Sequence, residues 1–250
     1  ETKQHSQDVE ENLVKDQRGA IDYNFSFNPT PWEPFKNVKA LSSPILKIVK
    51  DFNLNYLPTS LSMNTKMNRQ YSQVKLRDLN ADPSIIGTNQ ALDMTFSRDF
   101  MWNRRFDIAY DLTRSLKFSF QSAMNANIAE PYKTPEVNPD YYKEWRDSVW
   151  SNIRKLGTPY AYQQVFSASW VLPLNKIPIF DWVTSNASYN STYDWNRMAR
   201  VSGDSQLGNI ATSMGAWQVD GTFNFETLYN KSKYLKDVNR RFATQPNSNK

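Results

Sequence analysis

Between Leu92 and Leu112, apolar and polar residues alternate without interruption. Successive side chains of a β-strand point to opposite faces, so this segment predicts one strand with an apolar face and a polar face. Globular strands usually have about 5–6 residues, and few exceed about 10. A strand this long with one acidic face is typical of a tall β-barrel wall. Its apolar side includes Phe106, Ile108, Tyr110 and Leu112, and its polar side carries Asp93, Asp99, Asp107 and Asp111.

The same alternation returns in six further segments, which we predict to be strands at about 21–28, 57–76, 116–128, 160–172, 183–195 and 217–225. Each has one polar side. The fold class is therefore all-β, an antiparallel meander of about seven long strands with short helices in the loops. The apolar side of these strands holds Leu116, Phe118, Phe120, Trp170, Trp217 and Phe223, and the polar side holds Asn125, Asn186, Asn190 and Asp220.

The connections differ in length at the two ends of this meander. Short joints at 111–116 and 172–182 lie at one end, and longer loops near 78–90, 129–159 and 198–209 lie at the other. Short turns on one side and long loops on the other are typical of outer-membrane barrels. Because such single-chain barrels have even strand numbers, seven strands would leave two edges open. We therefore expect other polypeptide to complete the wall.

The remaining segments divide the chain into three parts. Residues 1–19 are polar and predict a tail or loop, and 20–225 form the barrel-wall segment with a helical connector at about 31–52. An extracellular insertion at about 129–159 contains a helix at about 139–156, with Asn138 as N-cap and Gly157 as stop. This helix would be a rim or lid element, or would simply pack on neighbouring loops. Residues 226–250 predict a basic, helical periplasmic segment and tail.

Composition is compatible with a membrane barrel and with one soluble alternative. Mean hydropathy is −0.70, and no apolar run approaches the roughly 20 residues that a membrane-spanning helix needs. A barrel gives no such signal, because its inward residues are polar. The 8 Trp, 13 Tyr and 14 Phe suit the aromatic girdles of a barrel, and equally a soluble carbohydrate-binding protein. The net charge of +5 is mild and spread along the chain, so it does not indicate nucleic-acid binding.

Candidate catalytic chemistry is sparse. The absence of Cys excludes thiol chemistry and disulfides, and the single histidine, His5, lies in the polar N-terminal segment. The aspartates of 92–112 form a regular ladder, which suits a hydrated wall better than two carboxyl groups converging on one bond. With 7 glycines the chain contains no phosphate-binding glycine motif. We expect neither enzymatic activity nor a cofactor or metal.

Two features refine the barrel interpretation. Uncharged polar residues dominate the polar sides, which would keep a pore wet without retaining either sign of charge, although any solvated sheet face shares this composition. Arg98 and Arg104 lie on the apolar side. An Arg at the bilayer midplane of a barrel costs about 2–4 kcal/mol but only about 0–1 kcal/mol near the interface. We therefore expect both arginines at or above the membrane interface, with 106–112 in oil.

The turn and strand sequences also resemble one known family. The blocks that carry this resemblance are DLTRSL (111–116), IPIFDW (177–182), YNSTYDW (189–195), NFETLYNKSKYL (224–235) and PWEPFKN (31–37). They resemble segments of SprA/Sov, the giant outer-membrane translocons of the type IX secretion system in Bacteroidota, across about residues 20–240. None of these blocks is a catalytic motif.

The resemblance implies a very large single-polypeptide barrel that transports folded proteins across the bacterial outer membrane, in a family also linked to gliding motility. It implies as partners the remainder of the barrel polypeptide, a PorV-type barrel protein, a periplasmic plug protein, outer-membrane lipid and secreted cargo. This chain would be one wall segment. Two alternatives stay open: a TonB-dependent or porin-type transporter, which a narrower pore would distinguish, and a soluble carbohydrate-binding protein, which would not need detergent.

Overall fold

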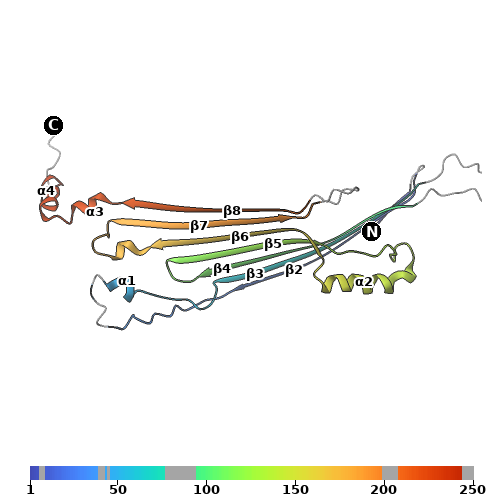
Figure 1. The fold of residues 1–250 in the computed structure, drawn as a ribbon, viewed down its shortest axis with the longest axis horizontal. Coiled ribbons are helices and arrows are strands. Elements are labelled where there is room, and N and C mark those ends of the chain that lie inside the picture. Colours follow the sequence, from blue (N-terminus) through green and yellow to red (C-terminus); the bar gives the residue numbers. More distant parts are fainter. Residues whose placement is uncertain (6–8, 39–42, 44–45, 77–93, 199–207, 244–250) are drawn as a thin grey trace, which may run out of the picture.

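Eight antiparallel strands form a single sheet in sequence order (Figure 1). The computed structural model describes residues 1–5, 9–38, 43, 46–76, 94–198 and 208–243. The strands are β1 (Thr2–Gln4), β2 (Val9–Ser26), β3 (Ser60–Leu76), β4 (Thr95–Asp111), β5 (Leu116–Asn127), β6 (Thr158–Leu172), β7 (Val183–Asn196) and β8 (Ile210–Phe223). The predicted antiparallel meander is confirmed, because β2 to β8 are its seven long strands. Period-two alternation located them except for the first half of β2 and the first half of β8, which begins at Ile210 and ends at Phe223.

The N-terminal part departs from the prediction of a tail at residues 1–19. Strand β2 begins at Val9 and pairs with β3 along the whole length of both strands, from Val9 opposite Leu76 to Ser26 opposite Ser60. The short strand β1 adds to it through pairs such as Lys3 with Leu13. A strand beside a long neighbour gains its hydrogen bonds from backbone groups, which every residue but proline supplies. Polar composition alone therefore did not prevent pairing.

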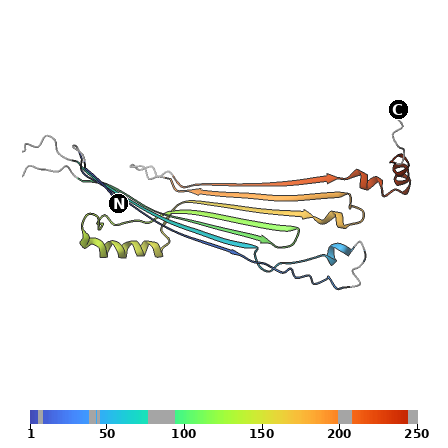
Figure 2. The same cartoon turned by 180° about the vertical axis from the view of Figure 1, so that it is seen from behind.

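The helices lie at opposite ends of the strands (Figures 1 and 2). At one end are α1 (Lys47–Lys50), the 3₁₀ turn η4 (Pro173–Lys176), α3 (Phe225–Tyr229) and α4 (Lys233–Ala243); at the other is α2 (Tyr142–Arg154), preceded by η3 (Pro139–Tyr141). None of the described helices is both long and apolar enough to cross a membrane. The connector at 31–52 is less helical than predicted. Its described residues form α1, turns and a short backbone bridge between Trp32 and Leu54, because Pro31 and Pro34 cannot donate the bonds that a helix needs.

Helix α2 has the predicted ends. The Asn138 side chain accepts a hydrogen bond from the Asp140 backbone at 3.0 Å. At the C-terminus Leu156 and Gly157 both have positive φ, 65° and 69°, and the Gly157 N–H donates to the Asn152 carbonyl at 2.9 Å. This is the left-handed ending that glycine favours.

The sheet is open at both sides. It does not close, since β1 and β8 are its terminal strands, and every residue of β8 is exposed. The solvent-accessible surface is 18700 Å², whereas a compact monomer of 29.1 kDa exposes about 11,400 Å². A single sheet with no covering layer over most of its area explains the excess.

Candidate functional site

The strand register separates the predicted site residues into two sets, one on each face. Asp107 pairs with Gln121, and the adjacent Ile108 pairs with Phe120, so neighbouring rows alternate between polar and apolar. The polar face carries Asp99, Asp107, Asp111, Asn125, Asn186, Asn190 and Asp220. The apolar face carries Phe106, Ile108, Tyr110, Leu116, Phe118, Phe120, Trp170, Trp217 and Phe223. Leu112 lies in the turn just after β4, and Asp93 lies outside the described residues.

Aromatic rings form a continuous row across the apolar face of β5 to β8. Phe118 stacks on Phe166 with ring centroids 6.0 Å apart, Phe166 lies 6.3 Å from Tyr189, and Tyr189 lies 4.5 Å from Trp217. The charged residues of these four strands, Lys117, Asp194 and Asp220, all lie on the opposite face. We call this charge-free surface, together with Phe106 and Ile108 of β4, the apolar band.

The apolar band is not a protein core. Trp217 is 77% exposed and Trp170 45% exposed, because no described element covers this part of the sheet. Monomeric soluble proteins rarely expose contiguous apolar patches larger than about 300–600 Å². A surface of this kind requires a partner of equal polarity, either another protein or the hydrocarbon of a bilayer.

The insertion, which spans residues 128–157 between β5 and β6, docks on the same apolar face. It lies next to the apolar band, on the side away from the 111–116 turn. Arg69 of β3 binds two carboxylates of the insertion: its guanidinium lies 2.7 and 2.9 Å from Glu130 and 2.8 and 3.1 Å from Glu136. The Trp145 indole N–H of α2 donates to Glu130 at 3.0 Å, and Arg69 lies over the Trp145 ring at 4.9 Å. We call Arg69, Glu130, Glu136 and Trp145 the arginine lock.

The charged side chains of the arginine lock are almost completely buried. The side chains of Arg69, Glu130 and Glu136 are 4%, 3% and 6% exposed. Burial raises the pKa of Glu136, but hydrogen bonds from Arg69 and from the backbone outweigh burial, and the pKa lies below its usual value. Two carboxylates share one guanidinium, so the lock depends on that single cation.

Arg98 and Arg104, the two arginines on the apolar side of β4, also contact the insertion. Arg98 donates to the Pro131 carbonyl and lies against the rings of Phe96 and Tyr132, which also contact each other. Arg104 donates to the Leu156 carbonyl at 2.9 Å and lies 4.3 Å above the Trp102 ring. Backbone carbonyls and aromatic faces thus partner charges that would otherwise lie on a bare apolar surface.

Part of the small buried core also lies under the insertion. Tyr71, Ala126, Ile128 and Val149 are at most 5% exposed, and Val149 belongs to α2. The helix therefore packs on the apolar face of the sheet itself, whereas the sequence led us to expect a rim or lid element or contacts with loops. Its apolar residues Trp145, Val149 and Ile153 face Met67 and Phe100 of the sheet.

The aspartates of the polar face in β4 are paired with neighbouring side chains and spaced along the strand. Asp107 accepts from Ser62 at 3.3 Å and from Arg105 at 3.0 Å, and Asp111 pairs with Lys117 at 3.3 Å. Asp107 and Asp111 are four residues apart on one strand, about 13 Å, too far for two carboxyl groups to act on one glycosidic bond. No described group of three acidic or histidine side chains could hold a metal ion.

The arginine lock was missed by sequence reasoning. The sequence feature that could have revealed it is the position of Arg69, a cation on the apolar side of β3 together with Leu61, Met63 and Tyr71. Arg98 and Arg104 are cations on the apolar side of β4 in the same way. Its partners are 61 and 67 residues away, so no local pattern joins them.

Comparison with known proteins adds no relative: no family model matches the chain, and no curated protein matches it.

Proposed function

We propose that this chain is a wall segment of a large, protein-conducting β-barrel in the bacterial outer membrane, of the type IX translocon type that its turn sequences resemble. The apolar band faces lipid, and the polar face lines a water-filled pore. The insertion with α2 lies at the cell surface, and α3 and α4 lie in the periplasm. The observation that carries this proposal is the single, two-faced sheet, whose exposed apolar side has no charge from β5 to β8.

The height of the band matches a bilayer. A tilted barrel strand crosses the hydrocarbon with about 9–11 residues. Counted upward from Leu112, about 9–11 residues end between Arg104 and Trp102. Arg104 is the first charged residue on this side of β4. The aromatic and cationic pair formed by Trp102 and Arg104 suits a membrane interface, where both residue types are favoured. Above it, the insertion replaces lipid as the partner of the apolar face.

The open sheet favours a wide barrel. Eight strands are enough to close a small barrel, yet here β1 and β8 remain separate edges. Further strands of the same polypeptide would pair with both edges and widen the lumen. The side chains facing the lumen from β7 are mostly uncharged, among them Asn186, Ser188 and Asn190, which suits passage of diverse cargo.

A photo-crosslinking amino acid placed at adjacent positions of β7 tests this function. At Asn190, on the polar face, it is expected to capture secreted protein during export; at Tyr189, on the apolar face, it should capture lipid and no cargo. The two positions are matched in height. Cargo adducts at Tyr189, or none at Asn190 in cells that actively secrete, would contradict the protein-conducting role. Small solutes passing in the absence of protein adducts would instead indicate a porin-type transporter.

A further inference from the structure

A groove at one end of the sheet continues the apolar band. It has a volume of about 320 Å³ and is lined by Leu116 and Trp170 of the sheet, by Ile48 and Phe52 of the connector between β2 and β3, and by Pro173 of η4. Leu116 and Trp170 lie opposite each other on the apolar face. They border the band at the end of the sheet that carries α1 (Figures 1 and 2). The apolar lining of the groove therefore adjoins the band directly.

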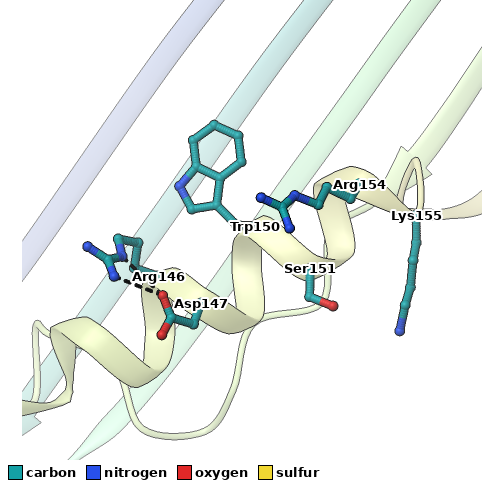
Figure 3. A pocket seen from close by; sticks show the side chains of 6 residues that line it. All are labelled: Arg146, Asp147, Trp150, Ser151, Arg154 and Lys155. Carbon is teal, nitrogen blue, oxygen red and sulfur yellow. Dashed lines mark hydrogen bonds and ion pairs between the residues drawn. The ribbon is translucent and has the colours of Figure 1, made fainter.

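Three chain segments build this groove, and contacts among them hold its walls in place. Asn53 is 7% exposed. Its side-chain carbonyl accepts a hydrogen bond from the Arg114 N–H at 2.8 Å, and its amide donates to the Asp51 carbonyl at 3.0 Å. An ion pair of 2.9 Å between Lys176 and Asp51 joins η4 to the end of α1. The hollow drawn in Figure 3 differs, because its lining residues, 146–155, belong to one helix and its C-terminal cap.

The charged side of the groove has more cations than carboxylates. The hydrogen bond from Lys176 lowers the pKa of Asp51, and the positive charges of Lys47 and Lys50 lower it further. Three ammonium groups therefore act on one carboxylate, and two positive charges of this cluster are not balanced by it. Lysine ammonium groups bind phosphate as point charges, and basic pockets at a membrane surface bind anionic headgroups. This side of the groove is complementary to a phosphate.

The charged residues lie farther from the band than the apolar lining does. Leu172 is the last residue of β6 and pairs with Ser185, so Lys176 lies in the connection beyond the ends of the strands. Leu116 and Trp170 lie within the strands. A phospholipid in a bilayer has the same order, with its phosphate outside and its acyl chains toward the centre. Tryptophan is also favoured at the boundary between these two zones.

We propose that this groove binds one anionic phospholipid of the inner leaflet. Its phosphate lies against Lys47, Lys50 and Lys176, and one acyl chain passes over Trp170 onto the apolar band. This inference rests on the proposed function, because only in a membrane does the apolar band meet hydrocarbon. The bound lipid holds the connector between β2 and β3 at the level of the headgroups.

Native mass spectrometry of the intact barrel in detergent tests the site, with dimyristoyl phosphatidylglycerol as the anionic probe and dimyristoyl phosphatidylcholine as the zwitterionic one. The unmodified protein is expected to retain the anionic lipid at least about fivefold better. The double variant Lys47→Gln, Lys50→Gln should lose most of that preference, and Lys47→Arg, Lys50→Arg should keep it, since arginine also binds phosphate. The matched control is Lys233→Gln, Lys236→Gln, which removes the same charge from exposed positions of α4 and should change nothing.

A further variant tests the apolar part of the groove at constant charge. Ile48→Trp adds side-chain volume where Ile48 lines the groove, so less space remains for an acyl chain. Retention of the anionic lipid should fall toward that of the zwitterionic one. Heat-modifiable electrophoretic mobility verifies that each variant is folded.

The outcomes separate this proposal from the proposed function. If the protein needs detergent but shows no preference for the anionic lipid, the lipid site is refuted and the barrel wall stands. The same holds if Lys47→Gln, Lys50→Gln keeps the preference, if Ile48→Trp retains as much anionic lipid as the unmodified protein, or if the α4 control loses the preference equally. If the folded protein stays dispersed without detergent, both proposals are refuted.

Discussion

Replacing Phe120 with Arg is expected to lower the free energy of unfolding in a bilayer by about 2–4 kcal/mol, the cost of an arginine near the midplane of a lipid-facing barrel surface. Phe120 lies between Ile108 of β4 and Phe166 of β6 on the apolar band. A guanidinium there has no carboxylate or carbonyl of the insertion within reach, unlike Arg69, Arg98 and Arg104. The measurement is the equilibrium unfolding of the barrel from lipid vesicles in denaturant.

The matched control is the next residue, Gln121, which points to the other face. Gln121→Arg would place the same charge opposite Asp107, where water and a carboxylate surround it, so we expect a change of less than about 0.5 kcal/mol. If both variants cost the same small amount, the apolar face is solvated and the membrane interpretation is wrong. The comparison cancels any effect of arginine on strand propensity.

Removing the cation of the arginine lock is expected to release the insertion. Arg69→Met leaves two carboxylates that are 3% and 6% exposed without their counter-ion, and breaking a buried ion pair in this way costs about 3–5 kcal/mol. Amide hydrogen exchange of α2 should accelerate by about a hundredfold or more, while exchange in β7 and β8, which lie away from the insertion, should be unchanged.

Two further measurements test whether the charge of Arg69 holds the insertion in place. The triple variant Arg69→Met, Glu130→Gln, Glu136→Gln should recover much of the lost protection, because it buries no unpaired charge. The pH dependence should also reverse. With Arg69 present, the pKa of Glu136 lies below its usual 4.5, so its contribution is present above that pH and is lost as pH falls through the lowered pKa. In Arg69→Met the hydrogen bond and the charge of Arg69 are lost, so burial, the largest influence on Glu136, raises its pKa, and docking becomes stronger on acidification. An unchanged pH response would contradict the role of Arg69.

The two faces of the sheet could be predicted from sequence because period two is a local property of the chain. Phe120 and Gln121 fall on opposite faces in any register that keeps β5 a strand. The first half of β2 could not be predicted in this way. Around Lys15 to Arg18 both sides of the strand are polar, so no alternation marks it, and its pairing with β3 depends on backbone groups.

The docking of the insertion depends on contacts that a local pattern does not contain. Trp145, Val149 and Ile153 repeat every four residues along α2, which indicates one apolar helix face to be buried but not the surface that buries it. Arg69, Arg98 and Arg104 determine which surface α2 covers, because their partners are carboxylates and carbonyls of the insertion. In the proposed barrel, arginines on the apolar side of neighbouring strands therefore mark the height at which the insertion covers that face. The sheet is open at β1 and β8, and no pattern within these strands determines what would pair with those edges.

Cysteine scanning along β5 tests the central claim most directly, because the chain has no native Cys. Single cysteines from Leu116 to Asn127 would be treated, in intact barrels in vesicles, with a membrane-impermeant maleimide. The account predicts alternation: fast reaction at Lys117, Ser119 and Gln121, and protection at Phe118 and Phe120, since a thiolate does not form in hydrocarbon. Equal reactivity at adjacent positions, or the same protection in a protein that remains dispersed without detergent or lipid, would contradict it.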